Sequence, residues 1–526
     1  MKRFRNLGLS LLSGLLLSSS WPTSGITSCI FVGFVPLMLL VQYTPKRAVF
    51  FAYCLLSMFL WNVGTTWWIW NSTSIGSIAA MLANSLLMCL PWLLYHYCIY
   101  RFANKYAIAY SSWIVCWMLF EYVHLNWELS WPWLTLGNVF AASTTWIQWY
   151  EYTGVAGGTL WVLVANVMVF TCWKAVKRSV NKGIIWRIGT IALWLGLPIC
   201  ISKWMLHNHY QETQAATQKV CIVQPNIDPY QKFEANTIAN QINTLLSLSA
   251  SADSSTTLLV WPETAMNAYD EQQNIEQNSY YFPVMQFLQQ HPRITLLSGI
   301  EMYKNYGTNA ATTTARKASN GMYFDALNAA VALQFNRSPQ FYIKSKLVPG
   351  VEHLPTFFNF LAPVFEQFGG TTGGYGMDTA AHNFSIPAAQ SRVAPVICYE
   401  SIYGAYVAEY VKKGAHLLAI VTNDGWWGNT PGHRQHLAYA QLRAIENRRW
   451  IVRSANTGIS AVIDAYGQVQ ATIPWNEASI LHASVPMVKK LTLYTLWGDY
   501  LYQLAAILSV VCVVVMVLLN RKLVKR

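Results

Sequence analysis

Three residues in the second half of the chain have the types that covalent acyl chemistry needs. Glu263 ends the sequence Trp-Pro-Glu, Lys344 lies in Tyr-Ile-Lys-Ser-Lys, and Cys398 follows Pro-Val-Ile. A thiol can attack a carbonyl as the nucleophile, a carboxylate can take its proton, and an ammonium can stabilise the developing oxyanion. The residues therefore predict a catalytic trio of Glu263, Lys344 and Cys398 that works through a covalent intermediate.

Each member of this trio comes at or just after the end of a predicted strand. Short apolar runs alternate with helical patterns over residues 212–490, which predicts an α/β layered domain. Ligand groups gather at the strand ends of open α/β sheets, so residues far apart in the chain can meet there. The predicted strands are 219–223, 257–261, 294–300, 326–333, 341–344, 393–398, 417–422, 450–454, 460–464 and 480–485, and the helices are 234–249, 281–290, 402–412 and 433–447.

Position alone leaves alternatives open for all three residues. Lys344 and Lys346 share one face of a strand, so alternation does not choose between them. Glu263 could be a carboxylate at a helix start, where the helix dipole favours it. Cys398 could be a core cysteine, although the polar continuation through Tyr399 and Glu400 argues against this.

Composition shows that the rest of the chain is built for a membrane. The 526 residues are 54% hydrophobic and only 11% charged, against roughly 25% charged residues in globular domains. Apolar stretches long enough to cross a bilayer lie at 6–21, 28–43, 48–70, 76–100, 106–124, 154–176, 184–204 and 499–520. The first stretch also fits a signal peptide, because a basic start precedes a short apolar run.

These stretches predict three parts: a polytopic α-helical membrane domain of seven spans over 1–211, a catalytic domain over 212–490, and a final transmembrane helix with a basic tail over 491–526. Lys and Arg lie on alternate turns between the spans, whereas the turns 21–27, 71–74 and 121–154 contain none. By the positive-inside rule, the basic turns and both termini are cytoplasmic and the catalytic domain lies outside. Topology thereby accounts for the net charge of +13, and a nucleic-acid partner is not needed.

Cysteine usage fits the same layout. Eight of the ten cysteines fall in predicted spans, and only Cys221 and Cys398 fall in the catalytic domain. The sequence contains no Cys-x-x-Cys pair or Cys/His cluster of metal-ligand spacing, so neither a metal nor a cofactor is expected. Cys221 is interpreted as a buried strand residue; a disulfide between Cys221 and Cys398 would abolish the nucleophile.

Four motifs in order resemble the nitrilase (carbon–nitrogen hydrolase) superfamily. They are Trp-Pro-Glu, Tyr-x-Lys-x-x-Leu-Val-Pro, Ile-Cys-Tyr-Glu and, at 422–428, Thr-Asn-Asp-Gly-Trp-Trp-Gly. Seven spans before such a domain and one after it narrow the resemblance to the apolipoprotein N-acyltransferase family of bacteria, as do Trp-Pro-Trp-Leu at 131–134 and Gly-Val-Ala-Gly-Gly at 154–158. The resemblance implies a nitrilase-like α-β-β-α sandwich outside the inner membrane. It also implies transfer of a fatty acyl chain from a phospholipid, through a cysteine thioester, to the N-terminal amine of diacylglyceryl-cysteine on an apolipoprotein.

The same resemblance gives roles to further residues. It selects Lys344 over Lys346 as the oxyanion-binding lysine. Glu352 matches a second functional carboxylate that orients Lys344, and Tyr399 and Glu400 match residues that support Cys398 or the incoming amine.

Aromatic residues are expected to meet the substrates. Phe233 stands where the family often has Trp, which keeps an aromatic face but loses the indole N–H donor. Residues 354–374 form an apolar, aromatic stretch with glycines. We interpret this stretch as a mobile arm that enters the outer leaflet, with Trp426 as a second interfacial residue; a core segment is the alternative.

Two other functions fit parts of the sequence. A membrane-tethered carbon–nitrogen hydrolase (amidase or nitrilase) would share the trio, although tethering needs only one span. A transporter or lipid-binding protein would use the outer domain as a scaffold, but few ionisable residues lie in the spans. We expect a monomer whose partners are the bilayer, a phospholipid acyl donor and a diacylglyceryl-modified apolipoprotein acceptor.

Overall fold

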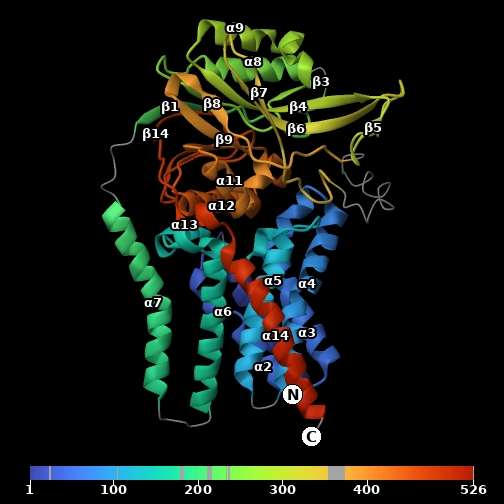
Figure 1. The fold of residues 1–526 in the computed structure, drawn as a ribbon, viewed down its shortest axis with the longest axis vertical. Helices are drawn as coiled ribbons and strands as arrows, with labels where there is room; N and C mark the ends of the chain where they lie inside the picture. Colours follow the sequence, from blue (N-terminus) through green and yellow to red (C-terminus); the bar gives the residue numbers. More distant parts are fainter. Residues whose placement is uncertain are drawn as a thin grey trace. The chain divides into compact units, whose positions relative to one another are not determined.

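The computed structural model describes residues 1–22, 25–102, 105–177, 183–209, 216–232, 234, 237–353 and 374–524. Its residues form two compact units (Figure 1). Unit 1 comprises Met1–Trp70, Ser74–His209 and Trp497–Arg526, and unit 2 comprises Asn71–Thr73 and Tyr210–Leu496.

Unit 1 is helical at every predicted apolar stretch. Its helices are α1 (Lys2–Ser19), α2 (Val35–Tyr43), α3 (Arg47–Thr66), α4 (Ser74–Arg101), α5 (Tyr106–Leu125), α6 (Tyr150–Lys177), α7 (Ile184–His209) and α14 (Tyr500–Val524). The stretch predicted at 28–43 is broken, because a short 3-10 helix, η1 (Thr27–Phe31), precedes α2. Within the described residues, five helices are long and apolar enough to cross a membrane: 47–71, 74–101, 150–177, 184–208 and 500–521. The total of eight spans therefore stays a prediction.

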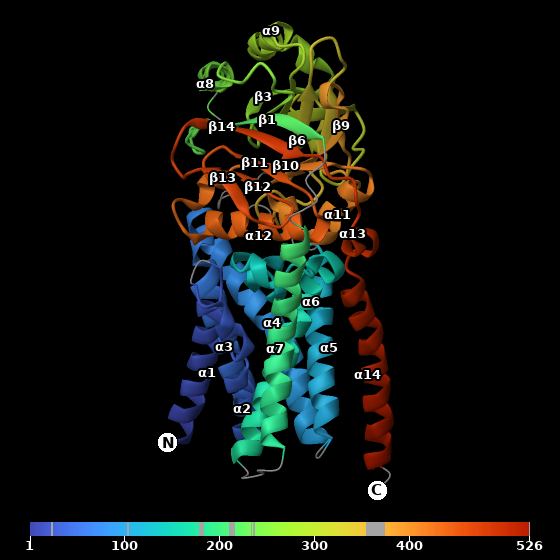
Figure 2. The same cartoon turned by 90° about the vertical axis from the view of Figure 1, so that its left-hand side faces the viewer.

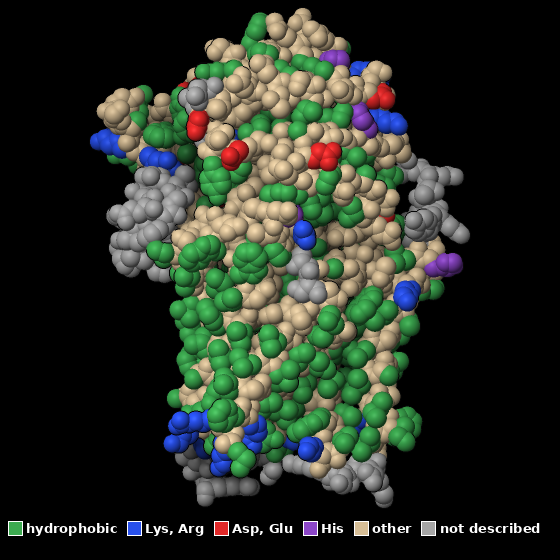
Figure 3. All heavy atoms as spheres, turned by 180° about the vertical axis from the view of Figure 1, so that it is seen from behind, with side chains coloured by type: hydrophobic (Ala, Val, Ile, Leu, Met, Phe, Trp, Pro, Cys, Tyr) green, Lys and Arg blue, Asp and Glu red, His purple; other side chains and the backbone are tan. Residues whose placement is uncertain are grey.

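Aromatic packing fills the inside of unit 1. Trp61, Trp92, Trp113 and Trp117 are fully buried, and their rings surround Phe34 with centroids 5.0 to 6.1 Å from its own. The face of unit 1 that Figure 3 shows is apolar as well, with Lys and Arg gathered at one end of the helices. An apolar outer surface on helices of this length is what a lipid environment requires.

One carboxylate is buried among these apolar helices. Glu121 Oε1 accepts hydrogen bonds from Trp117 Nε1 (3.0 Å) and the Leu136 N–H (2.8 Å). Its Oε2 accepts bonds from Thr159 Oγ1 and Tyr502 OH, both at 2.7 Å. Because these donors come from α5, the following loop, α6 and α14, Glu121 joins the C-terminal helix to the rest of unit 1.

Unit 2 contains two β-sheets. The first has the order β14-β1-β2-β4-β6-β5, with β3 beside β4 and β7 beside β6, and the second has the order β13-β12-β11-β10-β9-β8. The strands of the first sheet are β1 (Thr217–Gln224), β2 (Leu258–Val260), β3 (Met266–Glu271), β4 (Thr295–Gly307), β5 (Arg316–Lys317), β6 (Tyr323–Leu333), β7 (Gln340–Ile343) and β14 (Ser479–Pro486). Those of the second are β8 (Phe384–Ile386), β9 (Ser391–Ile397), β10 (Leu417–Thr422), β11 (Ile451–Ala455), β12 (Ser460–Ile463) and β13 (Val469–Ile473).

Helices cover the outer face of each sheet, which gives unit 2 an α-β-β-α order (Figures 1 and 2). Helices α8 (Ile238–Ser249) and α9 (Phe282–Gln290) pack on the first sheet, and α11 (Gly404–Lys412) and α12 (Pro431–Asn447) on the second. Strand β1 shows why the sheet needs a cover on both faces, because its apolar side chains alternate between two cores. Cys221 and Val223 join the α8–α9 core, whereas Val220 and Ile222 join the core between the sheets.

All ten predicted strands and four predicted helices form in unit 2. The sequence missed β3, β5, β8 and β13, which are short or carry polar residues. The expectation that the trio shares one sheet edge was wrong, because β2 and β7 belong to the first sheet and β9 to the second. Cys221 is buried in β1, and both it and Cys398 are free thiols.

Candidate active site

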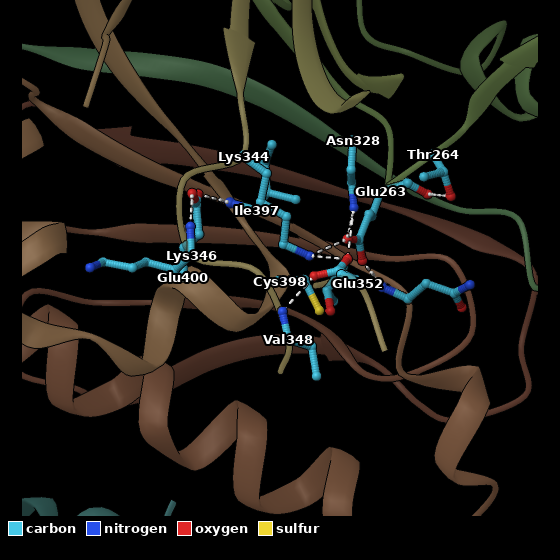
Figure 4. Close-up of polar contacts among 12 residues, drawn as sticks. Glu263, Thr264, Asn328, Lys344, Lys346, Val348, Glu352, Ile397, Cys398 and Glu400 are labelled. Carbon is cyan, nitrogen blue, oxygen red and sulfur yellow. Dashed lines mark hydrogen bonds and ion pairs between the residues drawn. The ribbon is translucent and has the colours of Figure 1, made fainter. Parts of the chain in front are cut away.

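The predicted trio comes together where strands of the two sheets end (Figure 4). Glu263 lies in the loop after β2, Lys344 directly follows β7, and Cys398 directly follows β9. Lys344 Nζ lies 3.0 Å from Glu263 Oε1, and Glu263 and Cys398 are close enough that each shifts the pKa of the other. The structure therefore brings a thiol, a carboxylate and an ammonium together in one site.

Glu263 is a buried carboxylate with both oxygens occupied. Its Oε1 accepts hydrogen bonds from Lys344 Nζ (3.0 Å) and Asn328 Nδ2 (2.9 Å), and its Oε2 accepts one from the Asn423 N–H (3.1 Å). Burial alone would raise the pKa of Glu263. The charge of Lys344 and the hydrogen bonds from Asn328, Lys344 and Cys398 outweigh burial and hold that pKa below its ordinary value. Glu263 is thus ionised and ready to accept a proton.

The backbone around Glu263 is fixed from behind. A Cβ atom on Gly299 would lie only 2.4 Å from the Thr264 nitrogen and 2.5 Å from Glu263 Cα, so only glycine fits there. The fully buried Lys232 donates to the Glu263 carbonyl oxygen at 2.8 Å. Burial lowers the pKa of Lys232 to about 8, against the opposing charges of Glu263 and Glu301.

Lys344 is fully buried between two carboxylates. Its Nζ lies 2.7 Å from Glu352 Oε1, and Glu352 Oε2 accepts a hydrogen bond from the Val348 N–H at 2.8 Å. Asn328 Nδ2 also reaches Glu352 Oε1 at 3.1 Å, so one amide links both carboxylates. Burial would lower the pKa of Lys344, but the charges of Glu263 and Glu352 raise it well above its ordinary value. The side chain therefore remains a cation.

Cys398 is half-buried and begins the 3-10 helix η11 (Cys398–Ile402) with a left-handed backbone, at a φ of 49°. Burial and the charge of Glu263 raise the pKa of its thiol well above the ordinary value, despite the ammonium of Lys344 and a hydrogen bond with Thr422. The resting thiol is therefore protonated, and it needs the adjacent base to become a nucleophile.

A buried polar network supports the backbone of Cys398. Ser401 Oγ donates to the Cys398 carbonyl oxygen at 2.7 Å, and His436 Nε2 lies 2.9 Å from the same hydroxyl. Asp424 contacts His436 Nδ1 at 2.9 Å and Arg453 Nη2 at 2.5 Å. Burial would raise the pKa of Asp424, but Arg453 and His436 hold it well below its ordinary range.

Glu400 joins the loop of Lys344 to the strand of Cys398. Its Oε1 accepts hydrogen bonds from Tyr342 OH (2.5 Å) and the Ser345 N–H (2.7 Å), and its Oε2 accepts one from the Ile397 N–H (2.9 Å). Complete burial raises the pKa of Glu400 to about 7, and these hydrogen bonds oppose the rise. Through these contacts Glu400 positions the loop of Lys344 and the end of β9, which precedes Cys398.

Both halves of the chain match known families. Residues 13–168 match the family model of the apolipoprotein N-acyltransferase N-terminal domain, and residues 219–489 match that of the carbon–nitrogen hydrolases. The apolipoprotein N-acyltransferase of Chlorobaculum tepidum is 31% identical over 502 residues, which cover 93% of this chain and 92% of the relative. This chain belongs to the apolipoprotein N-acyltransferase family.

One further relative agrees with this assignment, and one solved structure is similar to part of the chain. The apolipoprotein N-acyltransferase of Geobacter metallireducens is 26% identical over 94% of this chain and 92% of its own length. A solved carbon–nitrogen hydrolase of Helicobacter pylori G27 aligns with 54% of this chain and 94% of its own at 15% identity, with a TM-score of 0.36. The matches to the two family models and to the curated relatives confirm the family expected from the four motifs.

Some of the remaining predicted residues of this family member are described by the structure, and others lie outside the described residues. Lys346 Nζ lies over the rings of Tyr403 and Tyr406, at 5.3 and 5.6 Å from their centroids. The structure therefore brings Lys344, and not Lys346, to Glu263. Tyr399 is buried with its ring edge-on to Tyr403 at 5.4 Å.

Trp426 is half-buried and packs edge-on against Tyr230 at 5.4 Å. Phe233 and residues 354–373, which hold most of the predicted arm, lie outside the described residues. Within the part of the chain that is described, no group of three His, Cys, Asp or Glu side chains is placed to hold a metal ion.

Sequence reasoning missed two side chains that contact Glu263. Asn328 lies inside the apolar strand β6, where one polar residue in the run Ala-Leu-Asn-Ala-Ala was the available signal. Lys232 directly precedes Phe233, and nothing in its local sequence distinguishes it from a surface lysine.

Proposed function

We propose that this protein transfers a fatty acyl chain from a membrane phospholipid, through a thioester on Cys398, to the N-terminal amine of a diacylglyceryl-modified cysteine on an apolipoprotein. The observation that carries the proposal is that Lys344, Glu263 and Cys398 meet in one site, in a chain whose other unit has apolar, membrane-length helices. The names of the relatives point to the same reaction, since they are apolipoprotein N-acyltransferases over nearly the whole chain.

The first half-reaction forms the thioester. Glu263 takes the proton of the Cys398 thiol, and the sulfur attacks the ester carbonyl carbon of the phospholipid. The ammonium of Lys344 stabilises the oxyanion of the tetrahedral intermediate. The carbon–oxygen bond then breaks, and the lysophospholipid leaves with the proton that Glu263 returns.

The second half-reaction passes the acyl chain to the acceptor. The free amine of the diacylglyceryl-cysteine attacks the thioester carbonyl, and Glu263 takes a proton from the nitrogen. The carbon–sulfur bond breaks, an amide forms, and Cys398 regains its proton. Two products leave in turn from one site, so the kinetics are ping-pong. Water has to be excluded meanwhile, because a thioester also hydrolyses.

We assign the protein to the bacterial inner membrane as a monomer with eight spans. The parts are residues 1–211, 212–490 and 491–526, with both termini in the cytoplasm and the catalytic domain on the outer side. The alternation of basic and uncharged turns supports this topology, and so do the Lys and Arg side chains at one end of unit 1 (Figure 3). An outward catalytic domain meets phospholipid and exported lipoprotein at the same surface.

Lipid contacts are assigned to the aromatic residues Phe233 and Trp426 and to the apolar arm around residues 354–374. Deleting residues 356–368 is expected to abolish most acylation of Cys398 while the thermal unfolding temperature stays unchanged. Acylation at the wild-type rate in the deletion variant would reject the arm as a gate for acyl chains.

Trapping the intermediate tests the proposed reaction. The purified protein is incubated with phospholipid labelled in its acyl chains, and mass spectrometry locates the label. The label is expected on Cys398, and a diacylated lipopeptide should then remove it as the triacylated product. Cys398→Ala should take no label, whereas the matched variant Cys221→Ala should behave as wild type.

Other outcomes would identify the rival functions. A carbon–nitrogen hydrolase would release free fatty acid to water and leave the lipopeptide unmodified. A transporter or lipid-binding protein would leave every cysteine unlabelled.

A further inference from the structure

Thr422 is a buried residue that lies beside Cys398, and the reaction scheme above gives Thr422 no role. It ends β10, which runs parallel to β9 with Val421 opposite Ile397. The next residue on each strand is therefore Thr422 on one side and Cys398 on the other. Thr422 is fully buried, and its hydroxyl lowers the pKa of the neighbouring Cys398 thiol.

The hydroxyl of Thr422 has a second partner. Its Oγ1 donates to Asp424 Oδ1 at 2.9 Å. A hydroxyl carries one proton, so it can donate either to Asp424 or to the Cys398 sulfur, but not fully to both. While the sulfur is a neutral thiol, the carboxylate is the stronger acceptor.

Asp424 does not depend on this hydroxyl. Its two oxygens also contact His436 Nδ1 at 2.9 Å and Arg453 Nη2 at 2.5 Å. If the Thr422 hydroxyl turns away, Asp424 therefore keeps two partners, one of them a guanidinium. The switch of one hydrogen bond leaves no buried carboxylate without a donor.

The sulfur has few sources of stabilisation once it is an anion. The charged groups that act on it are Glu263, Asp424 and Lys344, and both carboxylates oppose a negative charge on sulfur. The ammonium of Lys344 favours that charge, but it is shared with Glu263 and Glu352. A neutral hydrogen-bond donor beside the sulfur would therefore supply stabilisation of the thiolate that these charged groups do not.

We propose that Thr422 is a further catalytic residue, whose hydroxyl turns from Asp424 to the Cys398 sulfur whenever that sulfur carries negative charge. This role rests on the proposed function of Cys398 as nucleophile. Thr422 keeps its own proton throughout, because Glu263 accepts the proton of the thiol. In the second half-reaction the electron pair of the breaking carbon–sulfur bond goes to sulfur, and the same hydroxyl stabilises the leaving thiolate.

The substitutions remove the hydroxyl of Thr422, and Thr422→Val also keeps the shape of the side chain. Thr422→Val and Thr422→Ala lose the donor, and Thr422→Ser restores it. Thr295→Val serves as the matched control, because Thr295 is a buried strand threonine whose hydroxyl contacts Gln334 Oε1 at 3.3 Å. All variants are made in the full-length protein, and thermal unfolding shows which of them are folded.

Two rates are measured in each variant. The first is alkylation of Cys398 by iodoacetamide as a function of pH, followed by mass spectrometry of the peptide that contains it. The second is the rate at which a lipopeptide amine removes the acyl group from preformed thioester. In Thr422→Val we expect the alkylation midpoint to rise by about one pH unit and aminolysis to slow about tenfold, as for loss of one hydrogen bond to a charged group. Thr422→Ser and Thr295→Val should resemble wild type.

An alkylation midpoint in folded Thr422→Val or Thr422→Ala equal to that of wild type would overturn the role of Thr422. Failure of the proposed function looks different. If the proposed function is wrong, neither the wild type nor any variant carries an acyl group on Cys398, but the alkylation midpoint still changes when the hydroxyl of Thr422 is removed.

Discussion

Lys344 lies closer to Glu352 than to Glu263: the distances from its Nζ to the nearest carboxylate oxygens are 2.7 and 3.0 Å. Glu352 therefore compensates much of the charge of the lysine and holds its position. Lys344 pairs with Oε1 of Glu263, whereas Oε2 of Glu263 accepts a hydrogen bond from the backbone N–H of Asn423. We therefore expect Glu352 to orient Lys344 and Glu263 to act as the base.

Glu352→Gln is expected to slow formation of the thioester on Cys398 about tenfold, the effect of losing one charge-assisted hydrogen bond. The glutamine can still accept the Val348 N–H, but Lys344 is then paired with Glu263 alone and weakens it as a base. The rate of acylation by labelled phospholipid measures the effect. Glu477→Gln on the exposed surface is the control, and equal rates in both variants would remove the orienting role.

Glu263→Gln is expected to slow the same step by about two to four orders of magnitude, the usual contribution of a general base. An amide cannot accept the thiol proton, and its NH₂ group would face the donors Lys344 and Asn328. Rapid-quench measurement of the acylated enzyme gives the rate. A loss of less than tenfold in folded protein would assign the proton transfer to another group.

Glu400 predicts a pH dependence of stability. Its pKa is raised from 4.5 to about 7 in the folded protein, so the fold binds the proton more tightly than the unfolded chain does. The free energy of unfolding therefore falls by about 3 kcal/mol as pH rises from about 4.5 to about 7. Above about pH 7 this contribution no longer changes. Glu400→Gln cannot titrate, so its stability relative to wild type should increase across this window. Denaturant unfolding at several pH values measures the difference; a constant offset between the two proteins would contradict it.

Glu121 predicts how the C-terminal helix is held. Glu121→Gln turns an NH₂ group toward donors that now bind a carboxylate, and should destabilise unit 1 by about 3 kcal/mol. Tyr502→Phe removes one donor from α14 and should cost about 1 kcal/mol. Thermal unfolding in detergent gives the ranking, and hydrogen exchange should increase first in α14. Equal exchange of α14 in wild type and Glu121→Gln would exclude this link.

Much of the fold of unit 2 was predictable because its strands are continuous apolar runs. β10 (Leu417–Thr422) was predicted with its observed bounds, since all six residues are buried. β13 was missed because only Ile473 of its five residues is buried, so the segment has no apolar pattern to detect. β5 has two residues, both basic, and forms only because β6 provides a partner.

The members of the trio were predictable, but their arrangement was not. Alternation gave Lys344 and Lys346 the same face, whereas β7 ends at Ile343 and the two side chains diverge after it. Asn328 could not be assigned from local sequence, because its function depends on two carboxylates that are 65 and 24 residues away. Contacts between the two sheets decide such roles, and a single sequence does not contain them in readable form.

The left-handed backbone of Cys398, with its φ of 49°, has a consequence for how this family can change. A side chain in that conformation costs about 1 kcal/mol, and glycine is spared the cost. Cys398→Gly should therefore be inactive yet lose little or no resistance to unfolding, in contrast to most substitutions of buried residues. The stability of the fold does not require a cysteine at position 398. Screens that select for thermostability alone will therefore retain folded, inactive proteins with a substitution there.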